Sequence, residues 1–130
     1  MKIIKAFAIL ALLFSANVMS AQSVAGKWPA LKTYDEVISR INNGVEQNNI
    51  EAIRAFSSTL ESFSQRLTAT EIPSSFNKPA IKTSVTTLQN KTKTLNDLVA
   101  AKGSDANLKA AFMDAYGQYQ QVLSLMADVK

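Results

Sequence analysis

The sequence predicts an all-α protein, an up-down-up-down four-helix bundle that follows a cleaved signal peptide. Three observations lead to this prediction. Apolar residues recur at steps of three and four along four successive segments. Short stretches rich in Pro, Gly and Asn separate these segments, and short connections favour antiparallel neighbours. No segment shows the period-two alternation of a β-strand. A three-helix bundle with a loosely attached first segment is the alternative.

Residues 1–21 are expected to be a secretory signal peptide. Lys2 and Lys5 give it a positive start, and the apolar run AFAILALLF is shorter than the ~20 residues of a membrane-spanning helix. Small residues lead to Ala21, where we expect cleavage, and no cysteine is present to carry a lipid anchor. The mature domain is then residues 22–130, periplasmic or secreted in a bacterium, with no stable membrane anchor after cleavage.

Composition excludes several classes of function. Loss of Lys2 and Lys5 leaves 12 basic residues against 10 acidic ones, and a net charge of +2 is too weak to indicate a nucleic-acid partner. The chain has no histidine and no cysteine. These two residues supply most general bases, most transition-metal ligands and all disulfides. The sequence therefore predicts a non-enzymatic protein with no cofactor and no disulfide.

The first helix is predicted to start at Pro29 or Ala30, because proline suits the first helical turn. Trp28 is expected to pack at this start, and Asn42-Asn43-Gly44 to end or kink the helix. Its apolar stripe has five members: Leu31, Tyr34, Ile38, Ile41 and Val45.

The second helix is predicted to start after Asn48, with Glu51 three residues on as in a capping box. Its predicted core stripe has six members: Ile50, Ile53, Phe56, Leu60, Phe63 and Leu67. A loop with two prolines follows over residues 70–79. In it, Ile72 and Phe76 are expected to cover the end of the bundle.

The third helix is predicted to begin between Asn77 and Pro79 and to stop at Lys102-Gly103, where Ser104 caps the fourth. The third stripe contains one polar residue: Ile81, Val85, Leu88, Thr92, Leu95 and Val99. The fourth stripe is apolar or aromatic throughout: Leu108, Phe112, Ala115, Tyr119, Val122, Met126 and Val129. Both keep a regular four-three spacing, which suits packing within the chain and also a homodimer through these helix faces.

The third helix is the most charge-biased segment, with five lysines over residues 78–102 against Asp97 alone. A docking face for an acidic partner is one interpretation. The interpretation we favour is a solvated face close to acids of other helices, such as Glu51, Glu61 and Asp114.

Three stretches, WPALKTYDEV (residues 28–37), IPSSFNKPAIK (72–82) and LNDLVAAKGSDANLKAA (95–111), resemble small exported bacterial helical-bundle proteins. These proteins are largely uncharacterised, and some are thought to bind metal. The resemblance covers most of the mature chain and implies the same fold.

Proteins of this group often carry histidines in their first and last helices. The resemblance places the corresponding positions here at Asp35, Asn43, Tyr116 and Gln120. Tyr116 and Gln120 are one helical turn apart, a spacing at which two side chains can share a metal ion. Because none of the four is histidine, they are candidates only for a degenerate site, in which Asp35 would be the one remaining ligand.

The main functional hypothesis is therefore an exported helical-bundle binding or interaction protein without enzymatic activity, whose ligand and partner the sequence does not identify. One alternative is a periplasmic metal-binding protein with a degenerate site or a site of oxygen and thioether ligands. A second alternative is a periplasmic protein resembling a stress chaperone.

Overall fold

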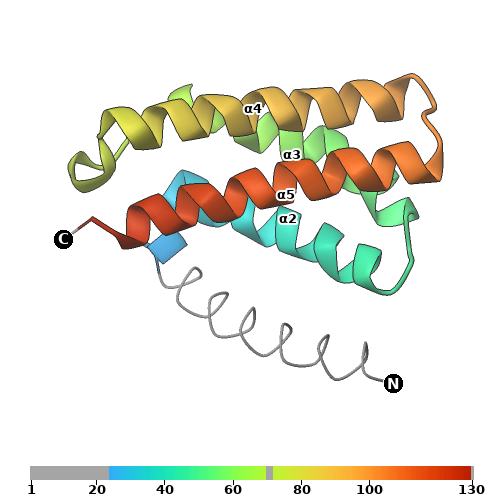
Figure 1. Ribbon diagram of the computed structural model, residues 1–130, viewed down its shortest axis with the longest axis horizontal. Helices are drawn as coiled ribbons and strands as arrows, with labels where there is room; N and C mark the ends of the chain where they lie inside the picture. Colours follow the sequence, from blue (N-terminus) through green and yellow to red (C-terminus); the bar gives the residue numbers. More distant parts are fainter. Residues whose placement is uncertain (1–23, 70–71, 130) are drawn as a thin grey trace, which may run out of the picture.

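The computed structural model describes residues 24–69 and 72–129, and in these ranges the chain is all-helical, with four long helices and no strand (Figure 1). The expected signal peptide and its cleavage site lie outside the described residues. The helices are α2 (Pro29–Glu46), α3 (Glu51–Ala69), α4 (Pro79–Ala100) and α5 (Asp105–Ala127), with a short 3₁₀ helix, η1 (Ser74–Phe76). Consecutive helices lie side by side and run in opposite directions (Figure 1). Among the described residues, no helix combines the length and hydropathy needed to span a membrane.

Three of the four predicted stripes form the core. All five predicted residues of the α2 stripe are buried, and α2 begins at Pro29 with Trp28 buried beside it, as predicted. The α4 and α5 stripes are also buried, except that Val99 and Val129 at their ends are half-buried. The helical periodicity of the sequence therefore identifies the inward face of these helices correctly.

The predicted stripe of α3 differs from the buried seam at three positions, and the first of them, Ile50, is half-buried and lies just before the helix. Phe56 and Phe63 are only half-buried, and the guanidinium groups of Arg40 and Arg66 lie 5.8 and 5.2 Å from their ring centroids. The buried seam of α3 instead alternates apolar residues with serines: Ile53, Ser57, Leu60, Ser64 and Leu67. Hydrophobicity alone would assign the phenylalanines to the buried face of α3. In the structure the small serines occupy that face where α3 packs against α4.

Both buried serine hydroxyls of this seam are hydrogen-bonded, and that of Ser64 donates to the Glu61 carbonyl oxygen of its own helix at 2.7 Å. The Ser57 hydroxyl donates to Asn96 Oδ1 at 3.1 Å, and Gln89 Nε2 donates to the Ser64 carbonyl oxygen at 2.8 Å. A buried polar group is tolerated when its hydrogen bonds are made. The α3–α4 contact is therefore a hydrogen-bonded seam between apolar layers.

The end of α2 also differs from the prediction. The helix passes through Gly44 and continues to Glu46. The N–H of Asn49 then donates to the Gly44 carbonyl at 2.8 Å, and that of Asn48 to the Val45 carbonyl at 3.0 Å. Asn48 has a φ of 61°, so this is a Schellman motif with Asn48 in the left-handed position. Asn48 thus ends α2 and does not cap α3.

Gly44 has a packing role within the helix. A Cβ built on it would lie 2.6 Å from the Cβ of Ala52 on α3 and 3.3 Å from the carbonyl oxygen of Asn49. Real Cβ atoms do not approach this closely. The absent side chain therefore lets the end of α2 meet the start of α3.

The α4–α5 turn confirms the predicted stop and cap. Lys102 occupies the left-handed position with a φ of 60°, and the N–H of Gly103 donates to the Leu98 carbonyl at 2.8 Å. The Ser104 hydroxyl accepts a hydrogen bond from the backbone N–H of Asn107 at 3.2 Å.

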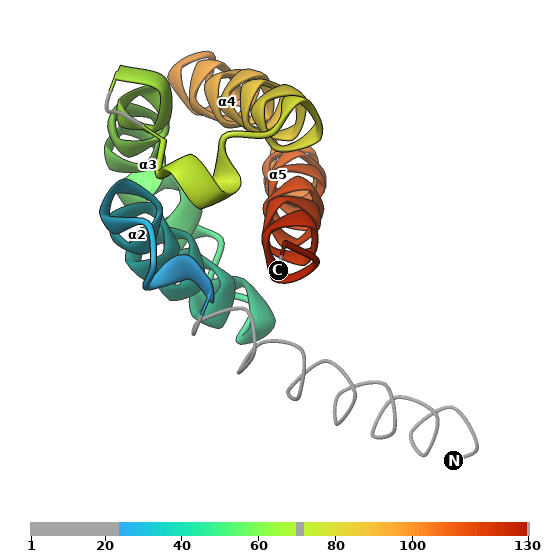
Figure 2. The same cartoon turned by 90° about the vertical axis from the view of Figure 1, so that its left-hand side faces the viewer.

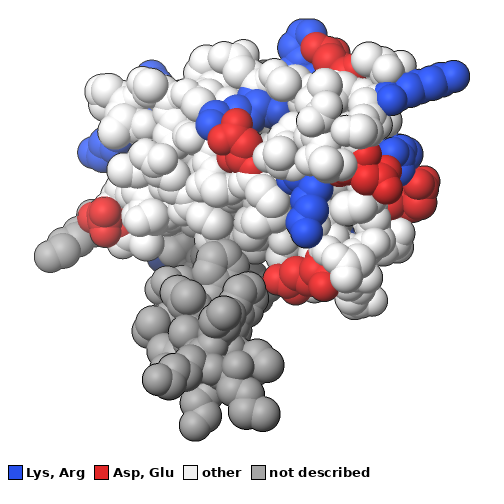
Figure 3. Space-filling view, turned by 45° about the vertical axis from the view of Figure 1, so that its right-hand side comes forward, with Lys and Arg blue, Asp and Glu red and all other residues white. Residues whose placement is uncertain are grey.

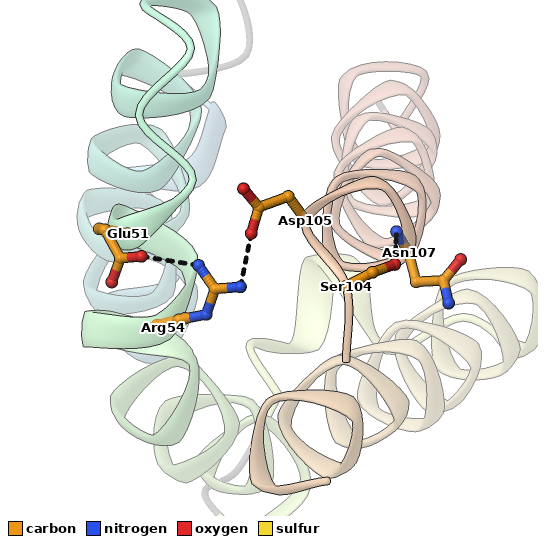
Figure 4. Close-up of polar contacts among 5 residues, drawn as sticks. All are labelled: Glu51, Arg54, Ser104, Asp105 and Asn107. Carbon is orange, nitrogen blue, oxygen red and sulfur yellow. Dashed lines mark hydrogen bonds and ion pairs between the residues drawn. The ribbon is translucent and has the colours of Figure 1, made fainter. Parts of the chain in front are cut away.

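One arginine links α3 to the start of α5 near this turn (Figure 4). Arg54 Nη1 lies 2.7 Å from Glu51 Oε1, and its Nη2 lies 2.5 Å from Asp105 Oδ1. Both carboxylates are exposed, so the bridge adds little stability and chiefly orients the two helix starts.

The opposite end of the bundle is covered by the loop between α3 and α4. In Figure 2, η1 lies across this end, near the start of α2 and the last turn of α5. Phe76 is buried and Ile72 packs half-buried against the core, which confirms their predicted covering role.

Candidate functional site

Three of the four predicted site positions come together where α2 faces α5. Burial, followed by the negative charge of Glu46, raises the pKa of Tyr116, its hydrogen bond to Gln120 lowers it, and the charge of Asp35 raises it. Asn43 is exposed and lies two turns from Asp35, about 12 Å along α2. The charge of Asp35 on α2 thus reaches Tyr116 on α5, and Tyr116 is hydrogen-bonded to Gln120 one turn on.

The direct partner of Asp35 is Tyr119, which the sequence assigned to the core alone. The buried Tyr119 hydroxyl donates to Asp35 Oδ1 at 2.5 Å. Burial raises the pKa of the Asp35 carboxyl, while the hydrogen bond from Tyr119 lowers it and the charge of Glu36 raises it. Burial, followed by the charge of Asp35, raises the pKa of Tyr119. Tyr119 is thus a neutral hydrogen-bond donor that holds the carboxylate.

A second buried tyrosine extends this polar contact into the core. The ring centroid of Tyr34 lies 5.3 Å from that of Tyr119, and its hydroxyl lies 2.9 Å from Thr92 Oγ1. Thr92 donates its one hydroxyl proton to the Leu88 carbonyl oxygen at 2.8 Å, so Tyr34 is the donor to Thr92. The polar atoms of this region therefore satisfy one another. The polar residue in the α4 stripe, Thr92, is the sequence signal for this contact.

The residues near Asp35 offer little to a metal ion. The described residues contain no group of three or more His, Cys, Asp or Glu side chains that could hold one. The thioethers do not converge either: Met126 is buried, Met113 is 46% exposed, and the two lie about 20 Å apart along α5. The arrangement around Asp35 joins α2 to α5.

A cleft of about 260 Å³ lies at the end of the bundle covered by η1. Its lining surface is about equally polar and apolar, and its described lining residues include one that is charged: Val24, Lys27, Pro73, Ser75, Phe76, Met126, Ala127 and Val129. We call it the bundle-end cleft. It draws residues from three separate parts of the chain, which the up-down order of the helices brings to one end.

Two polar groups at this end have no partner among the described residues. Lys27 is exposed and forms no ion pair there. The next residue, Trp28, is buried, and its indole N–H has no hydrogen-bond acceptor. A buried donor without an acceptor costs about 1–3 kcal/mol. The sequence predicted that Ile72 and Phe76 cover this end of the bundle. It did not predict that a cleft lies there.

Comparison with known proteins does not assign the chain to a family. No protein-family model matches it, and searches of curated proteins and of solved structures give no match. The resemblance to small exported bundle proteins stays a prediction.

Proposed function

We propose that this protein is a non-enzymatic, exported periplasmic binding protein whose bundle-end cleft takes a small apolar molecule with an anionic head group. The proposal includes cleavage after Ala21 and an up-down-up-down bundle as the mature domain. The observation that carries it is a cleft of mixed apolar and polar lining in which Lys27 has no ion-pair partner among the described residues.

The apolar part of the ligand would lie against the side chains at the covered end. Phe76 and Met126 belong to the buried core and also line the cleft, and Val129 packs against that core. Apolar area removed from water contributes about 25 cal/mol per Å². Methionine adapts its shape readily, which suits a site that accepts related alkyl chains.

The head group would meet the polar edge of the cleft. The ammonium of Lys27 attracts an anion, and a carboxylate can accept hydrogen bonds from it. Trp28 follows Lys27 in the chain and is the one tryptophan in it. Among the lining residues that the structure describes, none is a carboxylate that could pair with a cationic head group. The charge of the cleft therefore favours an anion over a cation.

The two alternative functions receive less support. A metal site of oxygen and thioether ligands would need donors that converge, and the thioethers of Met113 and Met126 lie far apart on α5. A chaperone that holds unfolded proteins needs an exposed apolar patch. Met113 is the one exposed large hydrophobic side chain among the described residues.

Fluorescence of Trp28 tests the proposal, because this single indole reports on the covered end. The protein is titrated with octanoate and, separately, with octylammonium, which share the alkyl chain and differ in charge. We expect a saturable change with octanoate and weaker binding of octylammonium. Lys27→Gln should weaken octanoate binding about fivefold, the equivalent of ~1 kcal/mol.

Lys32→Gln is the matched control, since Lys32 is an exposed lysine that does not line the cleft. It should leave octanoate binding unchanged. Equal binding of the two amphiphiles, or no saturable change with either, would contradict the proposal.

A metal titration with copper(I), copper(II), zinc and calcium, followed by thermal melting, tests the first alternative. Export is tested separately: protein recovered from the periplasm should begin at Gln22, and a retained leader would contradict this part.

A further inference from the structure

One face of the bundle is free of charge over an unusual length. Residues 83–90 of α4 and 115–127 of α5 contain no Lys, Arg, Asp or Glu. The two segments lie side by side, because Gln118 Nε2 donates to the carbonyl oxygen of Ser84 at 3.0 Å and to its hydroxyl at 2.8 Å. We call their exposed side the neutral face. In Figure 3 much of the visible surface is white, and the charged side chains gather mainly toward the right-hand side.

A shallow groove of about 500 Å³ runs between the two helices on this face. Hydroxyl, amide and aliphatic groups line it: Pro79, Ala80, Thr83, Ser84, Thr87, Gln118, Gln121 and Leu125. The exposed faces of soluble helices ordinarily carry many charged residues. Uncharged polar groups can leave water and pair with similar groups at a lower desolvation cost than charges can.

Gly117 lies on the exposed side of α5 next to this groove, and the fold gives no packing reason for it. A Cβ placed on Gly117 would meet nothing within 4 Å, whereas one on Gly44 would collide with α3. Glycine in the middle of a helix costs about 0.5–1 kcal/mol relative to alanine. Its absent side chain would allow another backbone to approach α5 closely from outside the chain.

Met113 lies one turn before Gly117 and is 46% exposed. It is the one exposed large hydrophobic residue among the described residues. The cores of protein–protein interfaces are depleted of charged residues and enriched in methionine. The exposed methionine and the missing charges thus occur together on the same side of the bundle.

We propose that a second copy of this chain packs its neutral face against this neutral face as a two-fold dimer. In such a dimer each surface meets its own copy, so a charged residue near the axis would oppose a like charge. A face without charge avoids this repulsion. At the edge of the face Lys91 Nζ lies 2.7 Å from Asp114 Oδ1, so the two charges that flank the face are paired with each other within the chain.

The size of the face sets the strength of the dimer. The uncharged part of α5 is about 20 Å long at 1.5 Å per residue, and two adjacent helices span about 20 Å. Because the uncharged part of α4 is only about 12 Å long, this gives roughly 300 Å² per copy, less than half of the ~800 Å² per partner of a standard interface. A dimer of this size should dissociate on dilution.

Analytical ultracentrifugation of the purified protein tests the dimer. We expect dimer at about 1 mM and mainly monomer at about 1 µM, a range that spans weak to moderate affinities. Gly117→Lys adds a charge that would face its own copy, and it should weaken dimerisation at least tenfold. Lysine also favours helix more than glycine does, so the monomer should melt at a higher temperature than the parent.

Ser62→Lys is the matched control, because Ser62 is exposed on α3, away from the neutral face. It adds the same charge and should leave the dimer intact. The inference is overturned if the parent is monomeric at 1 mM or if Gly117→Lys dimerises as well as the parent. Loss of the dimer in Ser62→Lys would also overturn the assignment to this face. None of these outcomes depends on whether the bundle-end cleft binds octanoate.

Discussion

Two glycines in this bundle should respond to the same substitution with opposite signs. At Gly44, a new methyl would lie 2.6 Å from the Cβ of Ala52, and because both atoms are attached directly to backbone, no side-chain rotation relieves the contact. Separating the helices should cost about 1–3 kcal/mol, against a gain in helix propensity of about 1 kcal/mol. Gly44→Ala should therefore lower stability by up to about 2 kcal/mol. Gly117→Ala has open space and should raise stability by about 0.5–1 kcal/mol.

Thermal and urea unfolding at about 1 µM, where we expect the protein to be monomeric, measure both effects. A change of 1 kcal/mol corresponds to about 4–8 °C in Tm for a domain of this size. Ala52→Gly removes the opposing methyl, so in the Gly44→Ala background it should recover part of the lost stability, with a coupling energy of about 1 kcal/mol. The reasoning is refuted if Gly44→Ala raises Tm as Gly117→Ala does, or if Ala52→Gly gives no recovery.

Three further predictions concern protonation and helix ends, and unfolding measurements check each. Burial raises the pKa of Asp35 in the folded protein above its ordinary value of 3.8, so folding favours the protonated carboxyl. The stability that this group contributes is therefore complete at a pH below its unfolded pKa and is lost as the pH rises through its folded pKa. The stability of Asp35→Asn relative to the parent should therefore increase with rising pH, and a constant difference would contradict this sign. Lys102→Gly should stabilise the protein by about 1 kcal/mol, because glycine adopts the left-handed backbone conformation of this position without strain. Asn48→Gly should stabilise it less, because asparagine tolerates the same conformation. Equal gains in stability would argue against this backbone explanation. Ser104→Ala should cost about 1 kcal/mol through loss of the cap on Asn107, and an unchanged midpoint would show that the cap contributes nothing.

Much of the fold follows from local patterns that the sequence displays. Pro29 and Pro79 begin helices, Ser104 caps one, and the regular spacing of apolar residues gives the inward face of three helices. The failure in α3 has a physical cause. Phe56 is more hydrophobic than Ser57, but the size of the gap beside α4 and the amide of Asn96 favour the serine. These depend on the neighbouring helix, which the local pattern does not include.

The candidate site shows the same limit. The resemblance directed attention to Asp35, Tyr116 and Gln120, of which Tyr116 is hydrogen-bonded to Gln120 and is reached by the charge of Asp35. The hydrogen bond that holds Asp35 comes from Tyr119, whose position in the stripe indicated only a core residue. A stripe position says which way a side chain faces but not which polar atom its hydroxyl will reach. The bundle-end cleft, built from three distant segments, likewise depends on how the helices are arranged.

A titration followed by two-dimensional amide NMR tests the central claim, that the bundle-end cleft is the binding site, most directly. Octanoate should shift amide signals at three places in the chain, residues 24–28, 73–76 and 126–129, because these segments line or adjoin the cleft. Signals of the neutral face and of the α2–α3 turn should stay in place. Saturable shifts confined to some other surface, or no shifts at all, would contradict the account.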